Sequence, residues 1–193
     1  KARDSGPRQP NMYFCIDTPQ LRIIGVDTGI LGRLDYDQGE WLRRVAAGPK
    51  PKLLISGSPI YSGDGISPRR ILGPDGHGAI GSLLGVLRDP ANNFVAALAG
   101  DVHHYERHAV RLEDGRMLPF VITGGGGAFM TSTHQIGPID LPGVDESGWV
   151  CFPTRGDSLR AFSIVLMRRL RTVAPWRRDR VPRGIPADEA ERI

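Results

Sequence analysis

The order of apolar and polar positions along the chain predicts alternating strands and helices. Short apolar runs of strand length, bounded by turn-forming or acidic residues, occur at Met12 to Asp17, Leu21 to Asp27, Lys52 to Ser56 and Phe94 to Ala99. After Asp35 the apolar residues recur instead at helical spacing, and Asp35 with Gln38 resembles the capping box that begins a helix. A strand, a helix and a strand in this order predict a parallel βαβ unit, and hence an α/β fold.

The remaining segments predict shorter elements and loops. Ser62 to Gly78 is rich in Gly, Pro, Ser and Arg and is predicted to be a long surface loop, followed by a short helix over Ala79 to Leu87. The apolar runs on either side of Glu113-Asp114-Gly115-Arg116 predict a β-hairpin. Gly137 to Gly148 is predicted to be a loop, and Ser158 the N-cap of a helix that runs to about Arg171. We expect one domain over residues 1–172 and a basic, proline-rich tail over residues 173–193.

Composition changes this prediction little. A chain of 193 residues is long enough for one domain, and hydrophobic and charged contents of 40% and 24% are ordinary for a soluble globular protein. No apolar run approaches the ~20 residues that span a bilayer, so we expect a soluble protein, with the cytoplasm slightly favoured. The chain begins with Lys1 rather than Met, so we also expect a fragment or a processed form.

The formal net charge of +4 comes largely from the tail, where arginines accumulate from Arg168 onward around Trp176. A charge run of this kind is usually a solvated segment, so nucleic-acid binding is not expected. The same residues are compatible with contact to an anionic membrane surface. The oligomeric state is not indicated by the sequence.

Candidate chemistry is concentrated directly after the apolar strand Phe94 to Ala99. Asp101, His103 and His104 follow Gly100 at the carboxyl end of that strand, where open α/β sheets place their functional groups. Asp101 and His103 would both face one metal ion if the backbone between them stays extended. Imidazole with carboxylate suits Mn, Fe, Zn or Mg, and such ions cleave phosphoesters by polarising phosphoryl oxygens and activating water. Alternatively, the histidines are ordinary loop residues that form hydrogen bonds.

The segment Gly100 to Arg107, reading G-D-V-H-H-Y-E-R, resembles the last signature of the calcineurin-like metallophosphoesterases, which include the purple acid phosphatases. That signature usually reads Gly-His-x-His, often with Tyr-x-Arg following. Val26-Asp27-Thr28, then Ser56-Gly57-Ser58-Pro59, and later I-T-G-G-G-G-A-F with Thr133-His134 follow the order of the same family's second half. The resemblance covers Tyr13 to His134. It implies an α/β fold in which a β-sandwich is flanked by helices in four layers (α/β/β/α), incomplete in this chain.

The resemblance implies His103 as a metal ligand, and Asp101 as a second ligand standing where the family usually has a histidine. Gly57 stands where the family usually has a metal-binding histidine, and glycine has no side chain that can bind a metal. The family's upstream signatures, Asp-x-His, Gly-Asp and Gly-Asn-His-Asp, do not precede Tyr13. The sequence therefore resembles the C-terminal half of a metallophosphoesterase, which would contain only part of the metal site.

Five further residues are candidates for contact with substrate. Backbone N–H groups at Gly125 and Gly126 could approach a phosphate, although these glycines could equally serve a tight turn. His134 could line the same cleft or lie on a loop. Tyr105 and Arg107 are candidate phosphate contacts, whereas Arg107 as a structural residue would pair with Glu106 or Asp101.

The function implied is that of a metal-dependent phosphoester hydrolase that uses a metal-activated water. Its substrate would be a phosphorylated small molecule or another phosphoester, and its cofactor a divalent Mn, Fe, Zn or Mg ion. The alternative is a non-catalytic descendant of the same fold that acts as a binding or interaction module.

Overall fold

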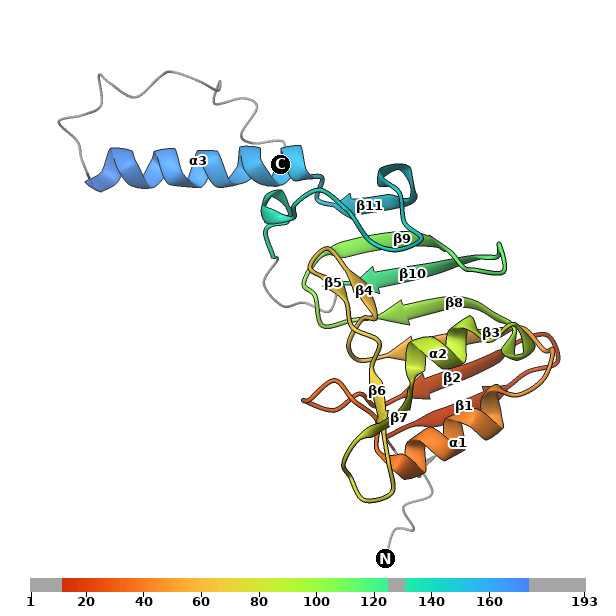
Figure 1. The fold of residues 1–193 in the computed structure, drawn as a ribbon. Helices are drawn as coiled ribbons and strands as arrows, with labels where there is room; N and C mark the ends of the chain where they lie inside the picture. Colours follow the sequence, from red (N-terminus) through yellow and green to blue (C-terminus); the bar gives the residue numbers. More distant parts are fainter. Residues whose placement is uncertain (1–11, 125–130, 174–193) are drawn as a thin grey trace, which may run out of the picture.

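The computed structural model describes residues 12–124 and 131–173, which form a seven-stranded sheet, two two-stranded sheets and three α-helices (Figure 1). The strands of the large sheet are β1 (Phe14–Asp17), β2 (Arg22–Val26), β3 (Lys52–Ser56), β8 (Phe94–Ala99), β9 (Tyr105–Arg111), β10 (Met117–Thr123) and β11 (Trp149–Phe152). They are arranged in the order β1-β2-β3-β8-β10-β9-β11. The helices are α1 (Tyr36–Ala46), α2 (Leu83–Arg88) and α3 (Arg155–Val173). The α/β class expected from the sequence is confirmed.

The centre of the large sheet is parallel. Strands β2, β3, β8 and β10 are consecutive neighbours that all run in the same direction, while β1, β9 and β11 pair antiparallel at its two sides. Helix α1 connects β2 to β3, which confirms the predicted βαβ unit, and α1 and α2 lie on the same face of the sheet (Figure 1). The carboxyl ends of the four parallel strands therefore meet at one edge.

Helix α1 begins at a cap that also joins it to the end of β2. The side chain of Asp35 accepts a hydrogen bond from the backbone N–H of Gln38 at 2.7 Å, as the capping-box pattern predicts. The Gln38 side chain reaches the backbone of Asp27 instead of Asp35: its Oε1 accepts from Asp27 N at 2.8 Å, and its Nε2 donates to Asp27 O at 2.9 Å. Gln38 thereby fixes the first residue beyond β2.

The opposite end of α1 is held by cationic side chains from two strands. Arg22 donates from Nη1 to the carbonyl of Val45 at 2.7 Å. Lys52 is fully buried, and its ammonium donates to the carbonyls of Gly48 and Lys50 at 2.6 and 2.7 Å. Burial lowers the pKa of Lys52. Arg22 thus satisfies a carbonyl in the last turn of α1, and Lys52 satisfies two carbonyls in the connection from α1 to β3, so both cations stabilise the start of β3.

The prediction of a long surface loop over Ser62 to Gly78 is wrong in part. This part of the chain contains two small hairpins, β4 (Tyr61–Ser62) with β5 (Gly65–Ile66), and β6 (Arg70–Leu72) with β7 (Ala79–Ser82). The helix predicted from Ala79 starts only at Leu83, because the preceding residues pair with β6 and the Ser82 side chain caps the helix by accepting from Gly85 N at 3.1 Å. Pairing between short strands leaves no periodic signal in so brief a segment.

The C-terminal part also differs from prediction. Strand β9 begins at Tyr105, so the end of the candidate segment, Tyr105 to Arg107, lies in a strand, and β11 follows directly on the predicted loop. Ser158 is not the N-cap of α3, which starts three residues earlier at Arg155. Thr154 caps the helix, since its Oγ1 accepts from Asp157 N at 3.1 Å. The expected tail from residue 174 onward lies outside the described residues.

The two faces of the large sheet have different surroundings. Leu54, which faces the helices, is 0% exposed, whereas its neighbour Ile55 on the other face is 37% exposed. Val95, Val150 and Phe152 are further large apolar residues exposed in the sheet. Of the four layers that the resemblance implies, residues 12–124 and 131–173 supply a helical layer and one large sheet. Within those ranges, no helix has the length and apolar character that crossing a membrane requires.

Candidate functional site

The candidate site lies at the edge where the four parallel strands end. The loop after β8 carries Asp101 and His103, and its neighbours are the loop after β3 and, beyond that, the loop after β2. Gly100 N donates to Gly57 O at 3.1 Å, and Ser58 N donates to Thr28 Oγ1 at 3.2 Å. These bonds connect all three loops. The candidate residues of β8 are thus held beside the ends of β2 and β3, where α/β sheets bind their ligands.

The backbone from Gly100 to His104 is tightly turned, not extended as the two-ligand hypothesis assumed. Asp101 has a positive φ of 72°, an uncommon conformation that Asp tolerates better than most residues. Val102 N donates to Gly100 O, and His104 N donates to Val102 O, each at 2.9 Å. Asp101 is exposed and His103 half-buried. A backbone held in a sparsely populated conformation at a strand end is typical of functional loops.

Gly124 at the end of β10 holds this turned loop from the side. Gly124 N donates to His104 O at 3.1 Å. A Cβ atom at Gly124 would lie 2.2 Å from the backbone N of His104 and 2.6 Å from the carbonyl oxygen of Val102. No side chain fits in that space, so the close approach of β10 to the loop requires glycine.

The metal donors available at this edge do not complete a site. A catalytic divalent ion is usually held by about three protein ligands, and Asp101 with His103 would supply two. Across residues 12–124 and 131–173, no group of three or more His, Cys, Asp or Glu side chains is placed to hold a metal ion. Gly57 adds no donor, although a Cβ atom there would approach only Thr28 Oγ1, at 3.3 Å. The described residues therefore do not by themselves fit a catalytic metal ion.

A buried polar cluster lies just behind the loop. Glu106 accepts hydrogen bonds from three side chains: its Oε1 is 2.5 Å from His104 Nε2, and its Oε2 is 2.7 Å from His108 Nε2 and 3.3 Å from Trp149 Nε1. Glu106 is 1% and His108 0% exposed, and His104 is also buried. Burial raises the pKa of Glu106, but the hydrogen bonds from His108, His104 and Trp149 together outweigh it and hold that pKa below the usual range. We call these four residues the Glu106 cluster.

The Glu106 cluster was not foreseen. His104 was one of the candidate metal-binding residues in the sequence, but the side chains of His104 and His108 are both buried, and their contact with Glu106 fits the hydrogen-bonding alternative. The cluster could have been predicted from the alternation of side chains along a strand. Residues 104, 106 and 108 share one face of an extended segment, whereas Tyr105 and Arg107 lie on the other face. Arg69 is a further residue near this edge that the sequence did not single out, and Gln38 was singled out only as part of a capping box.

The residues proposed to contact substrate lie on different elements. Tyr105 is half-buried and Arg107 exposed, both on β9, and Glu106 does not pair with Arg107 because its oxygens are taken by the cluster. His134 lies in a short 3₁₀ turn, where its Nδ1 is 2.9 Å from Ser158 Oγ and its ring packs on Phe162 of α3. Gly125 and Gly126 lie outside the described residues.

Comparison with solved structures finds a similarity to a purple acid phosphatase, PPD1, isolated from seeds of yellow lupin (Lupinus luteus). The TM-score is 0.45 and the sequence identity 18%, over 66% of this chain and 25% of that chain. The chain thus spans a quarter of the length of that phosphatase. No protein-family model and no curated protein matches this chain.

Proposed function

We propose that this chain forms part of a metal-dependent phosphoester hydrolase, in which Asp101 and His103 are metal ligands. The observation that carries the proposal is the position of these two side chains on a tightly held loop after β8, hydrogen-bonded to the loop after β3. An oxygen donor and an imidazole donor two residues apart suit Mn, Fe, Zn or Mg. When bound, such an ion supplies Lewis acidity and a more acidic water.

The roles of the chain's own residues follow from where they lie. Asp101 would donate a carboxylate oxygen and His103 a ring nitrogen, while Gly124 and the Glu106 cluster would keep the loop in place. Tyr105, Arg107, His134, Gly125 and Gly126 remain proposed contacts to the phosphate group of the substrate. Because the described donors number two, further ligands would have to come from residues outside the described ranges.

A second candidate function is a non-catalytic binding or interaction module built on the same fold. It is favoured by the absence of a three-donor group among residues 12–124 and 131–173, and by glycine at position 57. Such a module would keep the loop geometry without turning over a phosphoester.

The two functions are separated by metal analysis of the intact protein together with hydrolysis of an aryl phosphate in the presence and absence of added Mn²⁺. The hydrolase predicts a bound divalent ion and Mn²⁺-dependent release of phosphate. A protein with neither, whose His103→Ala variant behaves as the wild type, would be a binding module.

A further inference from the structure

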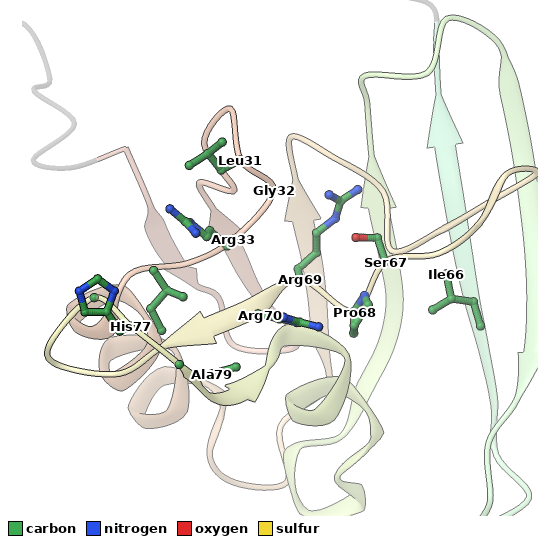
Figure 2. Close-up of a pocket in the computed structure, with 13 residues that line it drawn as sticks. Leu31, Gly32, Arg33, Ile66, Ser67, Pro68, Arg69, Arg70, His77 and Ala79 are labelled. Carbon is green, nitrogen blue, oxygen red and sulfur yellow. The ribbon is translucent and has the colours of Figure 1, made fainter.

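A cationic hollow lies beside the candidate site, between the loop after β2 and the β6–β7 hairpin (Figure 2). Its volume is about 540 Å³, within the range of small-molecule sites. The polar side chains that line it are Arg33, Ser67, Arg69, Arg70 and His77. Figure 2 shows His77 and Arg33 toward one end of the hollow, with Arg70 and Arg69 toward the other.

The residues that line this hollow carry positive charge and no negative charge. No carboxylate lines it, and Arg33 and Arg70, both exposed, form no ion pair with any described residue. The nearby Asp75 accepts a hydrogen bond from the backbone N–H of His77 at 2.9 Å. Several arginines that line one hollow without carboxylates are suited to bind an oxyanion.

Arg69 is the fixed member of this group. Its backbone has a positive φ of 54°, which is rare for a residue with a long side chain. Its half-buried guanidinium donates to the carbonyl of Pro59 from both Nε, at 2.9 Å, and Nη2. Gly32 provides the space for it, since a Cβ atom there would lie 2.4 Å from Arg69 Nη1. A guanidinium held in this way is pre-organised and loses little freedom when an anion binds.

Arg69 also connects the hollow to the candidate metal-binding loop. Pro59, to which it is bonded, belongs to the loop after β3. Burial lowers the pKa of Arg69, and the negative charge of Asp101 opposes that shift, so the two side chains are close enough to interact electrostatically. An anion bound at Arg69 would therefore lie on the side of the hollow that joins the loop after β3, and Gly57 of that loop is bonded to the loop after β8.

We infer that this hollow binds a phosphate or comparable oxyanion through Arg33, Arg69 and Arg70. Its assignment to the substrate rests on the proposed function: the substrate would be a phosphoester that carries a second anionic group, bound in the hollow while the ester lies at the loop after β8.

Anion binding is tested first without metal, by calorimetric titration of the intact protein with inorganic pyrophosphate in EDTA. Wild type is compared with the double variant Arg33→Gln/Arg70→Gln. The control is Arg44→Gln/Arg160→Gln, which removes the same charge from exposed positions outside the hollow. We expect the first variant to bind pyrophosphate roughly tenfold more weakly, since two charged hydrogen-bond donors are lost, and the control to bind as wild type. Absence of binding to wild type, or equal losses in both variants, would overturn the inference.

The assignment to the substrate is tested separately by steady-state kinetics. In a protein that hydrolyses aryl phosphate, Arg33→Gln/Arg70→Gln should raise KM for an ester with a second phosphate about tenfold and leave KM for a simple aryl phosphate unchanged. Equal effects on both substrates would overturn that assignment. A protein that binds pyrophosphate through the hollow but hydrolyses no phosphoester would contradict the proposed function while supporting the anion site.

Discussion

The carboxylate of Glu106 lies 2.7 Å from Nε2 of His108, and both side chains are almost completely removed from solvent. Glu106 is three residues beyond His103, and its other oxygen holds His104 at 2.5 Å. Strand β9, which follows the candidate metal-binding loop, is thus anchored by a buried carboxylate. Removing the carboxylate leaves buried side-chain donors without their anionic acceptor, which is costly.

Replacing Glu106 with glutamine should destabilise the fold. The amide keeps the shape but loses the negative charge, and its NH₂ group faces histidine N–H donors. We expect the free energy of unfolding to fall by about 3 kcal/mol, measured by urea denaturation followed by circular dichroism. Glu113→Gln, at an exposed position in the β9–β10 turn, is the matched control and should change stability by less than about 0.5 kcal/mol. Equal stability of the two variants would contradict the role of the Glu106 cluster.

The free energy of unfolding should depend on pH because Glu106 is ionised in the folded protein. The pKa of Glu106 is lowered in the folded protein, so its contribution is fully present above the unfolded value of about 4.3 and is lost as pH falls toward the lower folded value. Hydrogen bonds from Arg22 and Lys50 lower the pKa of Asp17 to about 2. Asp17 therefore also contributes stability that is lost as the pH falls toward about 2.

Comparing wild type with Glu106→Gln isolates the Glu106 contribution, because Asp17 is unchanged in both. We expect the difference in unfolding free energy between them to shrink as pH is lowered from about 5 to about 3. A difference that stays constant over this range would show that the Glu106 charge does not stabilise the fold.

Alanine at position 124 should disturb the candidate loop. Its Cβ would meet backbone atoms of His104 and Val102, which cannot move without shifting the segment that carries Asp101 and His103. We expect a cost of about 1–3 kcal/mol in unfolding free energy and a weaker affinity for Mn²⁺. Gly137→Ala is the control, since nothing lies within 4 Å of a Cβ atom there. Identical behaviour of the two variants would mean that the loop tolerates displacement.

Two neighbouring residues of β3 differ in exposure because only one face of the sheet is covered. Leu54 is 0% and Ile55 37% exposed, on opposite faces. We expect Leu54→Ala to cost about 2–5 kcal/mol and Ile55→Ala about 1 kcal/mol or less in the chain as described. If a longer form of the protein covers the outer face, Ile55→Ala should become clearly more costly there, as measured by denaturation of both forms. Equal costs for the two substitutions in the present chain would contradict the open face.

The sequence predicted the elements whose signals are local. Short apolar runs predicted the strands β2, β3 and β8, and Asp35 predicted the start of α1. The small hairpins around Arg70 and the edge strand at Trp149 depend on pairing with distant residues, so local patterns could not predict them.

The candidate site was predicted in outline only. Asp101 and His103 lie on the loop after β8, as the end of the apolar run at Gly100 predicted, but the backbone between them is tightly turned, where the two-ligand hypothesis assumed an extended one. The positive φ of Asp101 and the contact of Gly124 with His104 arise from tertiary packing, and local sequence carries no trace of them. The burial of His108 depends on which way β9 faces, and the bond from Arg69 to the carbonyl of Pro59 depends on the tertiary fold around the β6–β7 hairpin.

The central claim is that Asp101 and His103 bind the metal ion of a phosphoester hydrolase. Its most direct test is the Mn²⁺-dependent rate of aryl phosphate hydrolysis by the intact protein and by Asp101→Asn and His103→Asn, with Asp64→Asn as an exposed control. Each ligand variant should lower kcat/KM by about a hundredfold or more while circular dichroism shows an unchanged fold, and the control should keep the wild-type rate. Hydrolysis that does not depend on Mn²⁺, or ligand variants as active as the control, would contradict it.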